Sequence, residues 1–72
     1  MQYAVVIERE GDSFGAYVPD LPGCIAVGES EEEVRILIRE AIAFHLDGMR
    51  EDGDPILPPC AHVEYVVIAT AA

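Results

Sequence analysis

Four side chains in this sequence are of types that bind zinc, and two of them stand close together. Cys60 and His62 are separated by one residue, whereas Cys24 and His45 are isolated in other parts of the chain. A structural zinc site takes four ligands, which are usually supplied as two closely spaced pairs. Only one pair has that spacing here. We therefore expect no metal site, and no residue pattern indicates another cofactor.

The stretch "YVPDLPGC", residues 17–24, contains a carboxylate that could take part in a different chemistry. Asp20 is a candidate ligand for a two-metal nuclease site. An aspartate beside a proline–glycine bend is also typical of an Asx-turn, and we prefer this structural interpretation. Pro22 and Gly23 suit a tight reversal of the backbone, so we predict a structural role for both.

Covalent catalysis has little support in the residues present. The only serines, Ser13 and Ser30, occupy a turn and a helix-cap position. His45 lies within an apolar helical stripe, where a histidine is typically a hydrogen-bonded structural group rather than a general base. Neither cysteine has a basic neighbour in the sequence that would favour a thiolate. We predict no catalytic residue and hence no enzymatic activity.

The segments that position these side chains predict a small sheet. β-branched residues and alternation indicate a hairpin formed by residues 3–8 and 14–19, joined by a Gly/Asp turn. Residues 24–28, "CIAVG", predict a third strand that has Ile25 and Val27 on one side and smaller residues on the other. A fourth strand is predicted for "HVEYVVIA", residues 62–69.

One helix follows the third predicted strand. Ser30 and Glu33 have the spacing of a capping box, and we expect the helix to run to about Glu51, before Gly53 and Pro55. Its apolar stripe has helical spacing and comprises Val34, Leu37, Ile38, Ala41, Ile42, His45 and Met49. The order β-β-β-α-β predicts an α+β fold, with the helix on one face of an antiparallel-rich sheet.

The charge balance points to a particular kind of partner. Four arginines, no lysine and 14 acidic residues give a formal net charge of -10 for the 72 residues. Such a surface repels nucleic-acid phosphates and attracts basic proteins. The chain has no basic leader segment and no apolar run of membrane-spanning length. We expect a single cytoplasmic domain over residues 1–72, with no direct binding to nucleic acid or membrane.

Geometry also predicts self-association. A short sheet has two edges with unpaired backbone groups, and the segment "CIAVG" has no lysine or proline to protect it. One helix covers only one face of the sheet, so apolar residues remain on the other face. We expect a homodimer or a tetramer formed through the sheet. Ile36 and Ala43, opposite the main helical stripe, are a second candidate interface.

The sequence resembles the HicB-like antitoxins of type II toxin–antitoxin systems along nearly its whole length. The matching motifs are "YVPDLPGC" at 17–24, "GES-EE" at 28–32, "EAI-FHLDGM" at 40–49 and "DGDPI-PP" at 52–59. The resemblance implies a truncated ribonuclease H-like core with no nuclease activity. It also implies binding to a small basic HicA-like toxin that cleaves messenger RNA, with the antitoxin covering the toxin's active site.

Many members of that family carry a C-terminal DNA-binding module, whereas this sequence ends at Ala72. We therefore expect no such module. The acidic residues chosen as candidate contacts with the partner are Asp20, Glu29, Glu31 and Glu32. Two alternatives stay open at this point: a solitary oligomeric regulatory domain without a toxin, and a metal-dependent nuclease that uses Asp20.

Overall fold

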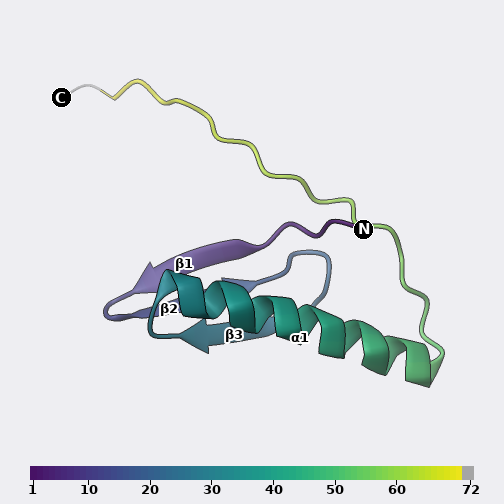
Figure 1. Ribbon diagram of the computed structural model, residues 1–72. Helices are drawn as coiled ribbons and strands as arrows, with labels where there is room; N and C mark the ends of the chain where they lie inside the picture. Colours follow the sequence, from purple (N-terminus) through teal and green to yellow (C-terminus); the bar gives the residue numbers. More distant parts are fainter. Residues whose placement is uncertain (71–72) are drawn as a thin grey trace.

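The computed structural model describes residues 1–70 as a three-stranded antiparallel sheet, one long helix and an extended C-terminal part (Figure 1). The strands are β1 (Val6–Glu10), β2 (Ser13–Tyr17) and β3 (Ile25–Gly28), and they lie in the order β1-β2-β3. The helix, α1, runs from Glu31 to Asp52 along one face of the sheet. The α+β class and the single covering helix are therefore confirmed.

The strand register divides the side chains between two faces of the sheet. Ile7 pairs with Ala16, which in turn pairs with Ala26, and this row faces α1. On the opposite face, Tyr17 lies between Val6 and Ile25. No element among residues 1–70 covers that face, which we call the open face, and Ile25 is 65% exposed there. The predicted alternation along the third strand is thus confirmed.

The core lies between the sheet and the first half of α1. Its buried residues are Ala16, Val18, Leu21, Cys24, Val34 and Ile38. Three of them come from the loop between β2 and β3, which is folded on itself: the Val18 N–H donates to the carbonyl of Cys24, and the Leu21 N–H to that of Val18. Pro22 and Gly23 form the exposed tip of this loop. Gly23 has a φ of 84°, in the left-handed region that favours glycine.

Both ends of α1 have the capping interactions expected of a stable helix. The Ser30 hydroxyl accepts a hydrogen bond from the Glu33 N–H at 3.0 Å. The Glu33 carboxylate reaches back to the Glu29 N–H at 3.4 Å, one residue before the donor of a standard capping box. At the other end, Gly53 has a φ of 73°, and its N–H donates to the carbonyl of Arg50. The observed end, Asp52, is one residue beyond the predicted one.

The prediction of a fourth strand was wrong for the single chain. Residues 62–69 are extended, but they pair with no strand among residues 1–70 and lead away from the sheet (Figure 1). We call residues 60–70 the C-terminal segment. Its β-branched residues favour an extended backbone, but a strand also needs an edge with which to exchange hydrogen bonds. That edge is not specified by local sequence.

Replacing Ser30 with alanine tests the cap of α1. The substitution removes the acceptor for the Glu33 N–H and should lower the free energy of unfolding by about 0.5–2 kcal/mol. Chemical denaturation followed by far-UV circular dichroism measures the change. Ser13→Ala is a useful control, because the Ser13 hydroxyl donates only to the exposed carbonyl of Glu10. An unfolding midpoint equal to that of the wild type would show that the cap contributes nothing.

At Gly28 the end of β3 lies close against the first turn of α1. A methyl group at this position would lie 3.2 Å from the backbone nitrogen of Val34 and 3.1 Å from the Glu33 carboxylate. Gly28→Ala should therefore destabilise the fold by about 1–3 kcal/mol, because the backbone has to shift. Gly48→Ala is the matched control, since nothing lies within 4 Å of that position and alanine favours helix. In thermal unfolding, the melting temperature of Gly28→Ala should fall and that of Gly48→Ala should rise relative to the wild type.

Candidate functional site

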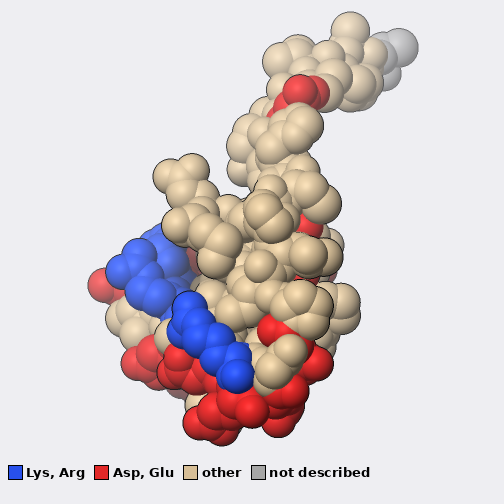
Figure 2. All heavy atoms as spheres, turned by 90° about the vertical axis from the view of Figure 1, so that its right-hand side faces the viewer, with Lys and Arg blue, Asp and Glu red and all other residues tan. Residues whose placement is uncertain are grey.

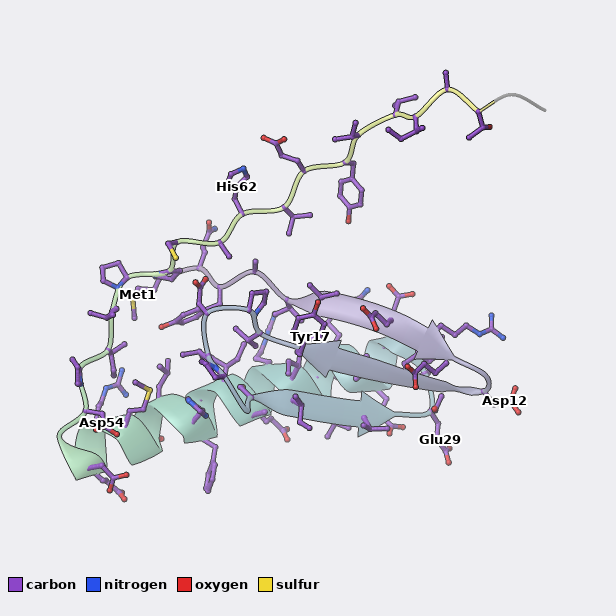
Figure 3. All side chains as sticks on the ribbon, turned by 180° about the vertical axis from the view of Figure 1, so that it is seen from behind. Met1, Asp12, Tyr17, Glu29, Asp54 and His62 are labelled. Carbon is purple, nitrogen blue, oxygen red and sulfur yellow. The ribbon has the colours of Figure 1, made fainter. Side chains whose placement is uncertain are left out.

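The antiparallel sheet brings acidic residues from two separate turns to one end of the molecule. Phe14 of β2 pairs with both Arg9 of β1 and Gly28 of β3, so the β1–β2 turn lies beside the start of α1. Figure 3 shows Asp12 and Glu29 at this same end. We call the exposed carboxylates that gather here the acidic end; they are Glu10, Asp12, Glu29, Glu31 and Glu32.

Most of the negative charge at the acidic end is free to attract a partner. Glu31 forms an ion pair with Arg35 at 3.0 Å, but both side chains are 58% exposed, and such a pair contributes little to stability. The first-turn acids also interact favourably with the positive end of the helix dipole. The fold is thus compatible with this negative charge in the absence of a partner, and the exposed carboxylates remain accessible to a partner.

Asp20 lies away from the acidic end, because the loop that carries it precedes β3, whereas Glu29 follows β3. Its carboxylate accepts a hydrogen bond from the Cys60 thiol at 3.2 Å and another from the Ala61 N–H at 3.1 Å. These contacts hold the pKa of Asp20 below its usual value, with the thiol as the larger cause. The carboxylate fastens the C-terminal segment to the β2–β3 loop, 40 residues earlier in the chain. The bend itself is held by backbone hydrogen bonds.

The two cysteines have different surroundings. Cys60 is exposed, and its hydrogen bond to Asp20 raises the pKa of the thiol, an effect that the negative charge of Asp20 reinforces. Cys24 lies in the core, and burial raises the pKa of its thiol. Within residues 1–70, no three His, Cys, Asp or Glu side chains are grouped so that they could hold a metal ion.

Two further residues singled out in the sequence lie on or near the outer surface of α1. His45 is half-buried and lines a shallow groove near the end of the helix, together with the exposed Phe44. Ile36 is 55% exposed. The described residues contain no hydrogen bond to the His45 ring, so its structural role stays a prediction.

A second group of acids lies at the other end of α1, and it includes Glu51, Asp52 and Asp54. Figure 2 looks at the molecule from this side and shows acidic side chains gathered over its lower part, with basic side chains beside them. Here Arg50 pairs with Asp47 at 3.1 Å. Acidity alone therefore does not select one surface, and the two groups can be compared by mutation.

Glu10 and Asp12 were missed as candidate contacts. The sequence did contain a signal for them: in a meander of three antiparallel strands, the first turn and the end of the third strand lie at the same end of the sheet. The register of β1, β2 and β3 brings these two acids to the same end of the sheet as Glu29.

Comparison with known proteins assigns the chain to a family. A sequence profile described as "HicB_like antitoxin of bacterial toxin-antitoxin system" matches residues 3–71. The chain belongs to the HicB-like antitoxin family. Membership indicates a role in a toxin–antitoxin system. Within residues 1–70, no helix is both long enough and apolar enough to cross a membrane.

Several relatives support this HicB-like assignment. The chain is 39% identical over 67 residues to an uncharacterized 14.9 kDa protein from the rep-hol intergenic region of Haemophilus phage HP1, a match that covers 93% of this chain and 50% of the phage protein. It is 33% identical to a UPF0150 protein of Thermoplasma acidophilum, over 78% of this chain and 83% of the relative. A UPF0150 protein of Archaeoglobus fulgidus is 37% identical, with 75% and 83% covered. No solved structure gives a significant match.

The contact between Asp20 and Cys60 can be tested in this HicB-like chain by thiol chemistry. Asp20→Asn replaces the carboxylate whose hydrogen bond, reinforced by its negative charge, raises the pKa of Cys60, so a larger fraction of the thiol is ionised at pH 8 and alkylation becomes several-fold faster. The rate is measured by mass spectrometry with iodoacetamide, and the buried Cys24 is a slow internal reference. Asp12→Asn, at the acidic end, should leave the rate unchanged. Equal rates in the wild type and Asp20→Asn would show that the contact is absent in solution.

Proposed function

We propose that this chain is the antitoxin of a toxin–antitoxin pair. It binds a small basic HicA-like toxin and neutralises it by covering the active site with which the toxin cleaves messenger RNA. The profile match over residues 3–71 carries this proposal. The net charge of -10 supports it, because a strongly acidic protein attracts a basic partner and speeds their encounter. The chain acts by binding alone, in the cytoplasm, where its partner meets messenger RNA.

The acidic end is the surface proposed to meet the toxin. Its carboxylates come from two turns and project from one end of the fold, so they can contact a basic surface together. Glu29, just before the helix cap, and the first-turn acids Glu31 and Glu32 are the central contacts in this proposal. Asp20 is instead proposed to anchor the C-terminal segment, since both oxygens of its carboxylate already accept hydrogen bonds from that segment.

The chain is also proposed to self-associate, as a homodimer or a tetramer. The open face of the sheet carries Val6, Tyr17, Ile25 and Val27, and the last two are 65% and 67% exposed. A face of this kind favours a two-fold interface between identical copies. The β-β-β-α order of the single chain supports a relationship to a truncated ribonuclease H-like core.

Neutralising three carboxylates of the acidic end tests whether this surface binds the toxin. A triple variant with Glu29, Glu31 and Glu32 changed to glutamine should bind a purified HicA-like toxin roughly tenfold or more weakly, mainly through a lower association rate at low salt. Surface plasmon resonance at several salt concentrations measures both rates. Inhibition of messenger-RNA cleavage by the toxin should weaken in parallel.

The matched control changes Glu51 to glutamine and Asp52 and Asp54 to asparagine, which removes the same charge from the far end of α1. This variant should bind the toxin nearly as well as the wild type does. An equal loss in both triple variants would mean that net charge acts without a defined surface. A wild-type chain that neither binds nor inhibits the toxin at low salt would overturn the antitoxin proposal. Circular dichroism confirms that α1 is retained in each variant.

A further inference from the structure

The C-terminal segment exposes more apolar surface than a small protein normally leaves in water. Tyr65 is 95% exposed and Val67 is 96% exposed, and Val63, Val66 and Ile68 are exposed as well. In Figure 1 the segment leads away from the sheet and from α1. An exposed apolar stretch of this size indicates a surface made for contact with another protein chain.

The pattern of the segment is that of a strand with both faces in use. Val63, Tyr65 and Val67 alternate with Glu64, Val66 and Ile68, so each side of an extended backbone has apolar side chains. Such a pattern is typical of a strand that is covered on both faces rather than of a strand at a solvated surface. Residues 64–69 would span about 20 Å at 3.3 Å per residue, long enough to lie along the whole of β1.

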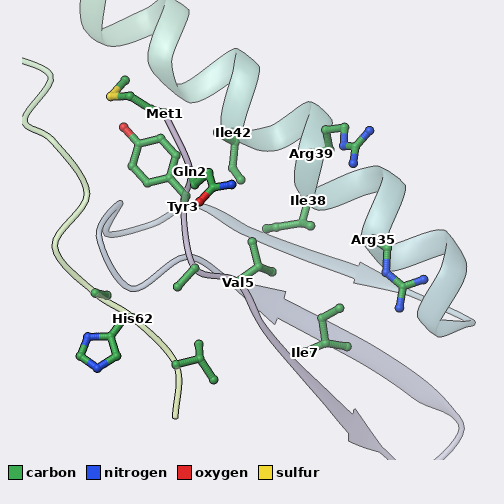
Figure 4. Close-up of a pocket in the computed structure, with 13 residues that line it drawn as sticks. Met1, Gln2, Tyr3, Val5, Ile7, Arg35, Ile38, Arg39, Ile42 and His62 are labelled. Carbon is green, nitrogen blue, oxygen red and sulfur yellow. The ribbon is translucent and has the colours of Figure 1, made fainter.

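The domain has an open place beside β1 for such a strand. The helix α1 packs mainly on β3 and β2 and least on β1, and β1 pairs on one side only. A cavity of about 750 Å³ opens between the helix and the residues that lead into β1 (Figure 4). Its apolar lining includes Tyr3, Val5, Ile38 and Ile42, and the start of the chain's own C-terminal segment, residues 61–63, also lines it. The side of the core that a fourth strand would close is therefore left open.

Polar groups around this cavity complement the segment. The Tyr3 hydroxyl is buried and has no hydrogen-bond partner within residues 1–70, a condition that an added backbone would relieve. Arg35 and Arg39 also line the cavity, and Arg39 forms no ion pair within the described residues. Glu64 is the only acid in the segment. Its contact with His62 at 3.3 Å is exposed and leaves it free to approach an arginine.

We propose that two copies of this chain exchange their C-terminal segments. Residues 64–69 of each copy lie along β1 of the partner as the fourth strand of its sheet, and their apolar side chains help to close the partner's cavity. The occupant is a second copy because Asp20 holds Cys60 and Ala61 at the domain and residues 61–63 line its own cavity, while the chain beyond Val63 leads away from its own sheet. A mutual exchange gives a closed dimer with two-fold symmetry, because each chain donates one segment and accepts one. Both segments are then paired, and no further copies are added.

This inference adds a strand exchange at β1 to the self-association proposed above for the open face. It uses no residue of the acidic end, so it can be tested without toxin. Light scattering over a dilution series should show the wild type at twice its chain mass of 7.8 kDa. A double variant, Tyr65→Asp with Val67→Asp, places two charges in the strand and should weaken dimerisation about 100-fold or more. Its circular dichroism should still show α1, because neither residue contributes to the core.

The matched control places the same charges on the outer surface of α1, as Ile36→Asp with Phe44→Asp, and should leave the dimer intact. Isotope-filtered NMR then identifies the contact directly, with labelled and unlabelled chains unfolded together and refolded. Cross-peaks between Tyr65 or Val67 of one chain and Tyr3 or Ile38 of the other are expected.

Three results would overturn the proposed exchange of segments, and each has a different consequence for the proposed self-association. A measured mass of 7.8 kDa at every concentration would also contradict the proposed self-association. A dimer whose segment contacts arise only within one chain shows that the segment closes on its own β1. A dimer that dissociates in the α1 variant but not in the segment variant moves the interface to the helix. None of these results bears on binding to the toxin.

Discussion

The structure depends on the packing of the first half of α1 against β2, β3 and the loop between them. Val34 is completely buried, and Gly28 lets the helix start within about van der Waals distance of the third strand. This contact places the helix over one side of a narrow sheet. The same contact leaves the β1 side of the core open, because a single helix cannot cover all three strands. The unfilled cavity is thus a consequence of how the core is packed.

The acidic residues illustrate how one feature can serve both folding and binding. The first turn of α1 contains three glutamates, and the helix dipole favours negative charge there whether or not a partner is present. The antiparallel meander then adds acids from the β1–β2 turn to the same end. Because the fold already stabilises this charge, the protein can present a strongly acidic surface without a large loss of its own stability. The antitoxin function proposed for this chain would use such a surface.

Asp20 links two parts of the molecule that are distant in sequence. Its carboxylate joins the loop after β2 to the start of the C-terminal segment. The position of that contact decides where the segment leaves the domain, and therefore which edge it can reach. An aspartate chosen from the sequence as a turn residue or a partner contact is, in the structure, an anchor for the chain's most apolar exposed stretch.

Local patterns in the sequence were sufficient to predict the sheet hairpin, the alternation of residues 24–28 and the helix, whose cap at Ser30 and end near Gly53 follow from short-range chemistry. They were sufficient because caps, turns and periodicity involve residues only a few positions apart. Three features were decided by tertiary structure alone. They are the contact of Asp20 with residues 60 and 61, the offset of α1 from β1, and the unpaired state of residues 62–69. Each of these depends on segments that are distant in sequence, and a strand-forming pattern does not specify the edge to which it pairs.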